Sequence, residues 1–190
     1  MLLISGDPYW AENCEDVAFN SYPAAMMPDY KALRYITSPN HVVSDSQNHH
    51  PGIDNSGPFL AMNPFSSRCC QHNHGFGWPY YAEHLVLATP DNGLAAVMYS
   101  ACKAKIKVGS KGTEVTLHEQ TNYPFEEAVR FTLSTPSKVR FPMYLRIPSW
   151  CKNASVKING KQEAVTLVAG EYARIEREWT NKDEVELMIP

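Results

Sequence analysis

The sequence predicts an α+β protein, in which a helical, loop-rich N-terminal part precedes an antiparallel β-sandwich. Three observations predict this fold. Apolar residues recur at helical spacing in two segments before residue 92, and a long stretch between these segments has no periodicity. From residue 94 onward, short segments alternate between apolar and polar residues. We therefore expect one domain at residues 1–92 and a second at 93–190.

The composition is typical of a folded protein and argues against two classes of partner. Of the 190 residues, 44% are hydrophobic and 19% are charged, which is the balance of a globular chain. The 17 basic and 20 acidic residues give a net charge of -3, so nucleic acid is not an expected partner. No apolar run approaches the roughly 20 residues that cross a bilayer, so we expect no membrane partner either.

Both ends of the chain suggest a fragment. Residues 1–7 are expected to form the last turn of a helix, and residues 184–190 alternate like a strand that stops without a turn or a polar tail. No signal peptide is recognisable in this segment of sequence, and the cellular compartment stays open between cytoplasm and periplasm.

The first complete helix is expected to begin at Asp7 and Pro8. Asp7 can cap the exposed N–H groups, and Pro8 lies where its missing donor costs nothing. The helix is expected to continue to Asn20. Helical spacing predicts that it buries one stripe of side chains: Trp10, Cys14, Val17 and Ala18.

The next segments predict a short strand, a long loop and a second helix. Residues 31–37 are expected to form the strand, and residues 38–58, which include a His-His pair, the loop. The second helix is expected over residues 78–88, with Pro79 in its first turn. Its buried face is expected to hold Tyr81, Leu85 and Ala88.

The remainder is expected to be entirely strands and turns. Asn159-Gly160 is a strong signal for a two-residue β-hairpin. The predicted strands cover residues 94–99, 103–108, 114–119, 129–134, 141–147, 155–158, 172–176 and 184–189.

The chemistry of the chain is concentrated in residues 68–78, which read Arg-Cys-Cys-Gln-His-Asn-His-Gly-Phe-Gly-Trp. Thiolate and imidazole are soft metal ligands and good nucleophiles. The residues alone leave three interpretations open. They could be a metal site, with a backbone kink between the cysteines and with His72 and His74 or two groups from elsewhere as further donors. They could also be a catalytic thiol without metal, or two buried cysteines beside a helix start.

The other three cysteines are expected to be core residues. Adjacent cysteines rarely bridge each other, because the ring that they would close is strained, and an odd total of five gives no disulfide framework. Buried thiols in apolar surroundings are common. This interpretation applies to Cys14, Cys102 and Cys151.

Several segments together resemble a known family of glycoside hydrolases. The chain is similar to family 127, the β-L-arabinofuranosidase group, over essentially its whole length. The residues that carry the resemblance are Gly6-Asp7-Pro8-Tyr9-Trp10-Ala11, Cys14 to Asn20, Lys31 to Tyr35, Arg68-Cys69-Cys70-Gln71-His72-Asn73 and Val139 to Trp150.

The resemblance implies a fold, an activity and specific site residues. It implies an (α/α)6 barrel followed by β-sandwich domains, so that residues 1–92 would be the last helices and loops of the barrel. It implies that Cys69 is a nucleophile that attacks the sugar while Cys69 and Cys70 are bound to zinc. It further implies that Glu15 and Tyr35 contact a carbohydrate substrate, a β-L-arabinofuranoside or a related plant sugar.

Two departures from the family pattern qualify this hypothesis. The remaining zinc ligands and the acid/base glutamate of the family lie upstream of Met1, so the fragment is expected to be inactive without the remainder of the parent chain. Gln71-His72 stand where many members have two prolines, which leaves the sugar undetermined. The alternatives are a non-catalytic carbohydrate- or partner-binding β-sandwich and a structural zinc protein.

Overall fold

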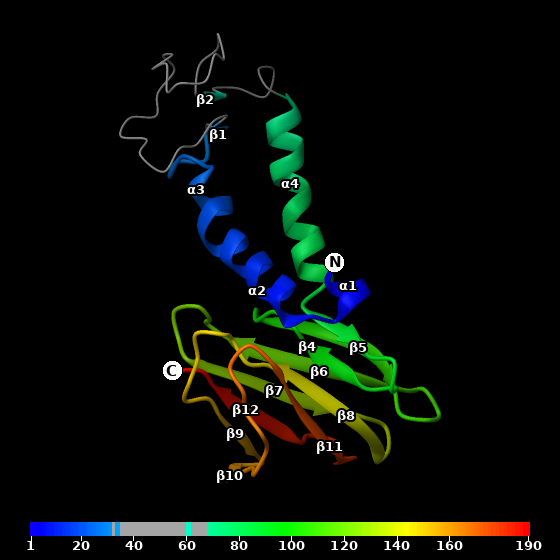
Figure 1. Ribbon diagram of the computed structural model, residues 1–190. Coiled ribbons are helices and arrows are strands. Elements are labelled where there is room, and N and C mark those ends of the chain that lie inside the picture. The colour runs from blue at the N-terminus through cyan, green and yellow to red at the C-terminus, as the bar shows by residue number, and fades with distance from the viewer. Residues whose placement is uncertain (32, 35–59, 62–67) are drawn as a thin grey trace. The chain divides into compact units, whose positions relative to one another are not determined.

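The computed structural model describes residues 1–31, 33–34, 60–61 and 68–190 (Figure 1). The chain divides into two compact units. One consists of Met1–Glu15 together with Glu83–Pro190, and the other of Asp16–Ala82. Each unit is described below by itself. No helix among the described residues is both long enough and apolar enough to cross a membrane.

The unit of residues 16–82 is built mainly of helices. A five-residue π-helix, η1 (Val17–Ser21), follows directly on α2 (Pro8–Asp16) and leads into α3 (Tyr22–Ala24). Two short strands, β1 (Leu33–Arg34) and β2 (Leu60–Ala61), pair antiparallel. The expected helix to Asn20 is therefore present, with its last turn widened to π geometry.

The longest helix differs from the prediction for residues 78–88. Helix α4 runs from Arg68 to Glu83, and residues 86–88 form strand β3 instead. Pro79 lies inside α4 rather than in its first turn. A proline there removes one intrahelical hydrogen bond and crowds the carbonyl four residues earlier, yet the helix continues past it. The metal-site interpretation required a backbone kink between Cys69 and Cys70, whereas the structure places both residues within this helix.

The N-terminal helices of the other unit correct the predicted buried stripe. Helix α1 (Leu2–Ser5) ends at Gly6, which adopts a left-handed conformation with φ 67°. Along α2 the buried positions are Ala11 and Glu15, whereas Cys14 is exposed and Trp10 is 37% exposed. The buried stripe is thus rotated by one residue and has a carboxylate in its middle, which apolar periodicity cannot predict.

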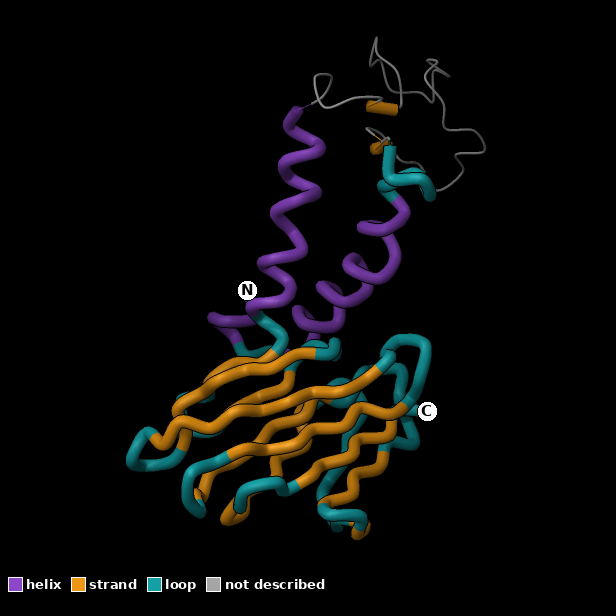
Figure 2. The backbone as a smooth tube through the Cα atoms, turned by 180° about the vertical axis from the view of Figure 1, so that it is seen from behind, coloured by secondary structure: helices purple, strands orange, loops and turns teal. Residues whose placement is uncertain are grey.

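The rest of this unit is a β-sandwich of two sheets (Figures 1 and 2). The six-stranded sheet has the order β10-β9-β12-β7-β6-β5 and the four-stranded sheet the order β11-β8-β4-β3. All described pairs are antiparallel except β4 and β8, which run parallel. The strands are β3 (Val86–Ala88), β4 (Leu94–Ala96), β5 (Cys102–Val108), β6 (Thr113–Thr121), β7 (Ala128–Ser134), β8 (Val139–Arg146), β9 (Ser155–Ile158), β10 (Lys161–Gln162), β11 (Tyr172–Trp179) and β12 (Glu184–Met188).

Each of the eight predicted strands is present, with ends shifted by a few residues. The segment expected at 94–99 is shorter, because the backbone leaves the sheet after Ala96 and the Val97 amide donates to the Leu85 carbonyl. The Asn159-Gly160 hairpin is confirmed. It joins β9 to β10, and both residues have positive φ, 51° and 76°, as a type I′ turn requires.

The core fills the space between the two sheets. Alternate residues of facing strands are buried, among them Phe131 of β7 and Phe141 of β8. Trp179 at the end of β11 is 1% exposed, and its indole N–H donates to the Phe141 carbonyl at 3.0 Å. Strand β5 forms one edge of the six-stranded sheet. Its exposed positions are lysines, which oppose edge-to-edge association.

Candidate functional site

Cys69 and Cys70 lie in the first turn of helix α4, which begins at Arg68. The first N–H groups of a helix have no intrahelical acceptor, and the helix dipole favours negative charge at this end. The position therefore suits a thiolate. Cys70 is half-buried.

The cysteine pair matches the donor chemistry of zinc but not the number of ligands. Structural zinc takes four ligands and catalytic zinc at least three protein ligands. Among the residues that the structure describes, no group of three or more His, Cys, Asp or Glu side chains could hold a metal ion. The cysteine pair thus fits part of a zinc site, and the remaining ligands would have to come from residues outside the described ranges or outside this chain.

His74 is held by a hydrogen bond and a ring contact within the helical unit. Its ring stacks on Tyr22 with centroids 4.5 Å apart and an angle of 10° between the planes. Its Nε2 lies 2.9 Å from the Tyr22 carbonyl oxygen. A carbonyl only accepts, so Nε2 carries the proton and cannot also bind a metal. His72 is exposed. His74 Nε2 is therefore not available as a metal ligand in this arrangement.

Tyr22 also fastens α3 to α4 through its hydroxyl. The Tyr22 hydroxyl lies 2.9 Å from the Asn73 carbonyl and 2.8 Å from the His74 carbonyl. The edge of Trp78 packs on the Tyr22 ring. Gly77 leaves the room for this contact, since a Cβ there would overlap the Tyr22 hydroxyl. The helix that carries the cysteines is therefore anchored three to four residues beyond Cys70.

Two of the expected features lie outside the described residues. Tyr35, which the resemblance assigns to the sugar, is one of them, and the His49-His50 pair of the long loop is the other. The expectations for both stay predictions. The expectation for the isolated cysteines is met only in part, because Cys151 is buried, Cys102 is half-buried and Cys14 is exposed.

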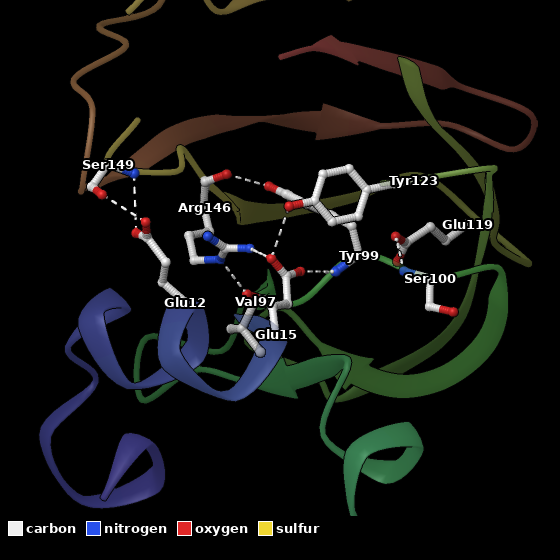
Figure 3. Close-up of polar contacts among 9 residues, drawn as sticks. All are labelled: Glu12, Glu15, Val97, Tyr99, Ser100, Glu119, Tyr123, Arg146 and Ser149. Atoms are coloured by element: carbon white, nitrogen blue, oxygen red, sulfur yellow. Dashed lines mark hydrogen bonds and ion pairs between the residues drawn. The ribbon is translucent and has the colours of Figure 1, made fainter. Parts of the chain in front are cut away.

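Glu15 lies in a buried cluster within the unit that contains the sandwich (Figure 3). Its side chain is 5% exposed and forms an ion pair with Arg146, which is completely buried. The Tyr99 amide donates to Oε1 at 2.7 Å and the Tyr123 hydroxyl to Oε2 at 3.1 Å. Three donors thus surround one carboxylate. That Glu15 contacts a sugar remains a prediction.

Burial and charge oppose each other in this cluster. Burial raises the pKa of Glu15, although Arg146 and the two other donors lower it. Burial lowers the pKa of Arg146, but the Glu15 carboxylate together with Tyr99 and Tyr123 outweighs this effect, so the pKa is raised. The three hydrogen bonds that the Glu15 carboxylate accepts favour its ionised form. Glu15 and Arg146 therefore form an ion pair.

The sequence analysis did not predict this cluster. Arg146 lies in an apolar strand, and its partner Glu15 is 131 positions away. Tyr99 and Tyr123 read as ordinary core aromatics at the end of a strand and in a turn. A signal was nevertheless present. Arg146 lies within the apolar run of residues 141–147, and a buried arginine almost always has a paired partner.

Comparison with known proteins gives a consistent result. Residues 1–83 match the family model described as the GH127 catalytic domain of β-L-arabinofuranosidase, and residues 93–190 match the GH127 middle domain. No curated protein matches the chain.

Solved structures agree with the family models. A glycoside hydrolase is 26% identical with a TM-score of 0.80, and the match covers 100% of this chain and 30% of that one. A GH127 β-L-arabinofuranosidase from Geobacillus stearothermophilus T6 is 28% identical with a TM-score of 0.76, covering 100% and 29%. A GH127 β-arabinofuranosidase at 21% identity and a TM-score of 0.72, covering 100% and 30%, shares the fold.

The chain therefore spans about 30% of the length of the solved structures that it matches. Its helical part corresponds to the end of the GH127 catalytic domain, and its two sheets correspond to the middle domain. Each segment that carried the resemblance in the sequence falls within one of the two matches. This chain belongs to the GH127 β-L-arabinofuranosidase family of glycoside hydrolases.

Proposed function

We propose that the chain is part of a retaining glycoside hydrolase that acts on β-L-arabinofuranosides or related plant sugars. Cys69 is the nucleophile in this proposal, and Cys69 and Cys70 are two ligands of a zinc ion. The observation that supports it is the place of both cysteines, in the first turn of α4 and inside the segment that matches the catalytic domain.

The chemistry of such a reaction needs two groups. A retaining glycosidase places a nucleophile and an acid/base group on opposite sides of the scissile bond. A cysteine attacks as the thiolate, and the N-terminal turn of α4 favours that anion. A bound zinc ion would keep the coordinated thiols deprotonated. The role of α4 is then to hold the Cys69 sulfur in place, with Tyr22 fixing the helix further along.

The other assignments rest on the family resemblance. We propose Glu15 and Tyr35 as sugar contacts, and the acid/base group and the remaining zinc ligands upstream of Met1. The 190-residue chain alone is then inactive. We also propose a domain boundary near residue 92. The limits of the two family matches, at residues 83 and 93, support this boundary.

The nucleophile can be tested by affinity labelling. A β-L-arabinofuranosyl haloacetamide should alkylate Cys69 in preference to Cys14, which is an exposed thiol and an internal control for unspecific reaction. Peptide mass spectrometry locates the label. Labelling of Cys14 as fast as Cys69, or no label on Cys69, would overturn the assignment of the nucleophile.

Activity and binding tests separate the proposal from its rivals. The chain should not hydrolyse a nitrophenyl β-L-arabinofuranoside, and full activity would refute the statement that its acid/base lies upstream. A binding module should keep its sugar affinity after Cys69→Ser. A structural zinc protein should unfold when a chelator removes the metal, whereas circular dichroism of this chain should be unchanged by the chelator.

A further inference from the structure

The β-sandwich contains a buried site for a carboxylate, here called the socket, which is formed by Arg146, Tyr99 and Tyr123. The Arg146 side chain is completely buried, and its Nε–H donates to the Val97 carbonyl at 2.6 Å. The guanidinium lies over the Tyr99 ring, 5.3 Å from the centroid. The Tyr99 hydroxyl in turn donates to the Arg146 carbonyl. The sandwich thus fixes this arginine from two sides.

A helix of the catalytic domain supplies the anion. Helix α2 lies within residues 1–83, which match the GH127 catalytic domain. Its residue Glu15 nevertheless enters the socket on the middle domain, and the chain up to Glu15 is compact with the sandwich. The contact therefore joins two parts of the chain that the family models assign to different domains.

A second carboxylate of the same helix makes a weaker contact. Glu12 precedes Glu15 by three residues, so the two side chains lie on one face of α2. Its Oε1 accepts from the Ser149 hydroxyl at 2.6 Å and its Oε2 from the Ser149 amide at 3.0 Å (Figure 3). This contact is exposed to water, so it contributes little to stability and serves as a matched control.

The energetics of the two contacts differ in kind. When one member of a buried ion pair is removed, a charge stays behind in a medium that cannot solvate it, and the loss is large. When both members are replaced by apolar side chains, no unpaired charge stays buried, so that penalty is absent within the sandwich. The directional attraction between α2 and the sandwich is then absent as well. Removal of either Glu15 or Arg146 alone should therefore destabilise the chain, because the remaining charge is buried without a partner.

We propose that Glu15 and Arg146 form an interdomain latch, in which the middle domain recognises a carboxylate of α2 and holds this helix on the end of the sandwich. The ligand of the socket is a helix of the same chain, and its recognition group is a carboxylate with three donors: the Arg146 guanidinium, the Tyr99 amide and the Tyr123 hydroxyl. This inference does not depend on the proposed catalytic role of Cys69. It is an alternative to the proposed sugar contact of Glu15, because the carboxylate that the three donors hold is the same group.

Hydrogen exchange of the whole 190-residue chain tests the latch, because it reports on α2 and on the sandwich separately. Glu15→Gln should speed exchange of the α2 amides by roughly tenfold or more. Glu12→Gln should change it by less than about twofold. Equal effects of the two substitutions, or unchanged exchange in Glu15→Gln, would overturn the proposal.

A double variant separates a latch from an ordinary core contact. Arg146→Met with Glu15→Leu leaves no buried charge, so the exchange rates of strand β8 should return to those of the unchanged chain. The α2 amides should stay fast, because the recognition group is gone. Recovery of α2 together with β8 would show that any apolar packing holds the helix, and the latch would be refuted.

A milder variant covers the case in which these substitutions prevent folding. Tyr123→Phe removes only the hydroxyl that donates to Glu15 and leaves the charges in place. It should speed α2 exchange by roughly threefold to tenfold, the effect of one hydrogen bond to a charged group. No change in α2 exchange would count against the latch.

Discussion

Cys102 and Glu119 face each other on the paired strands β5 and β6, with Cys102 Sγ 3.8 Å from Glu119 Oε2. Glu119 is completely buried, and its Oε1 accepts the Ser100 amide at 3.0 Å. Within the part of the chain that the structure describes, Arg146 is the one buried arginine, and it is paired with Glu15. Burial therefore raises the pKa of Glu119 well above its ordinary value of 4.5, and it raises the pKa of the Cys102 thiol to about 12.

This raised pKa predicts a pH dependence of stability. The folded chain binds the Glu119 proton more tightly than the unfolded chain does, so the contribution of Glu119 to stability is fully present below pH 4.5 and is lost as the pH rises through the folded-state pKa. Glu119→Gln should remove this dependence and stabilise the chain at pH 7 by roughly 1–3 kcal/mol. Urea unfolding at pH 4.5 and pH 7 measures the difference.

The control for this prediction lies on the same strand. Glu114 is exposed, and Glu114→Gln should change the free energy of unfolding by less than about 0.5 kcal/mol at either pH. A Glu119→Gln variant that is less stable than the unchanged chain at pH 7 would show that the carboxylate is ionised and satisfied in the folded state.

Two glycines of helix α4 predict opposite effects of the same substitution. Gly77→Ala places a methyl group where the Tyr22 hydroxyl lies, so Tyr22 must leave its hydrogen bonds to the Asn73 and His74 carbonyls. We expect a loss of roughly 1–3 kcal/mol in the stability of the helical unit. Thermal melting followed by the helical circular dichroism signal measures it.

Gly75→Ala is the matched control for this substitution. A Cβ at Gly75 meets nothing within 4 Å, and alanine is a better helix former than glycine by about 1 kcal/mol. The variant should therefore melt at the same temperature or higher. A destabilised Gly75→Ala together with an unchanged Gly77→Ala would contradict the placement of Tyr22 against α4.

Trp179 is expected to carry a large part of the stability of the sandwich. Trp179→Phe removes the hydrogen bond to the Phe141 carbonyl and leaves unfilled volume in the core. The expected loss is roughly 1–3 kcal/mol, measured by urea unfolding. Trp150 is 52% exposed, and Trp150→Phe should change stability by less than about 0.5 kcal/mol. Equal losses would refute the assigned core.

The β9–β10 turn predicts a substitution effect from backbone conformation alone. Gly160 has a φ of 76°, which a residue with a Cβ adopts only under strain. Gly160→Ala should lower stability by roughly 1 kcal/mol, and Gly160→Asn by less, because asparagine tolerates this region. Denaturant midpoints of the two variants check the order, and a Gly160→Asn variant that is less stable than Gly160→Ala would contradict it.

Local patterns were sufficient where one element determines its own structure. The hairpin at Asn159-Gly160, the helix that begins at Pro8 and all eight predicted strands follow from turn chemistry, capping and alternation. The family was recognisable for a similar reason, since the residues around Cys69 and Cys70 form short contiguous motifs. The extent of α4 was misjudged because Pro79 favours a helix start, whereas the structure has it inside the helix in spite of the lost hydrogen bond and the crowded carbonyl.

The sequence by itself determined the order of helices and strands, the family, and which cysteines are candidates for catalysis, because each of these depends on neighbours along the chain. Only the tertiary structure decided that Glu15 is buried and paired with Arg146, that His74 Nε2 is hydrogen-bonded to a carbonyl, and that Glu119 is completely buried. The charge state and accessibility of a polar side chain depend on groups that are distant in sequence, and no local periodicity records them.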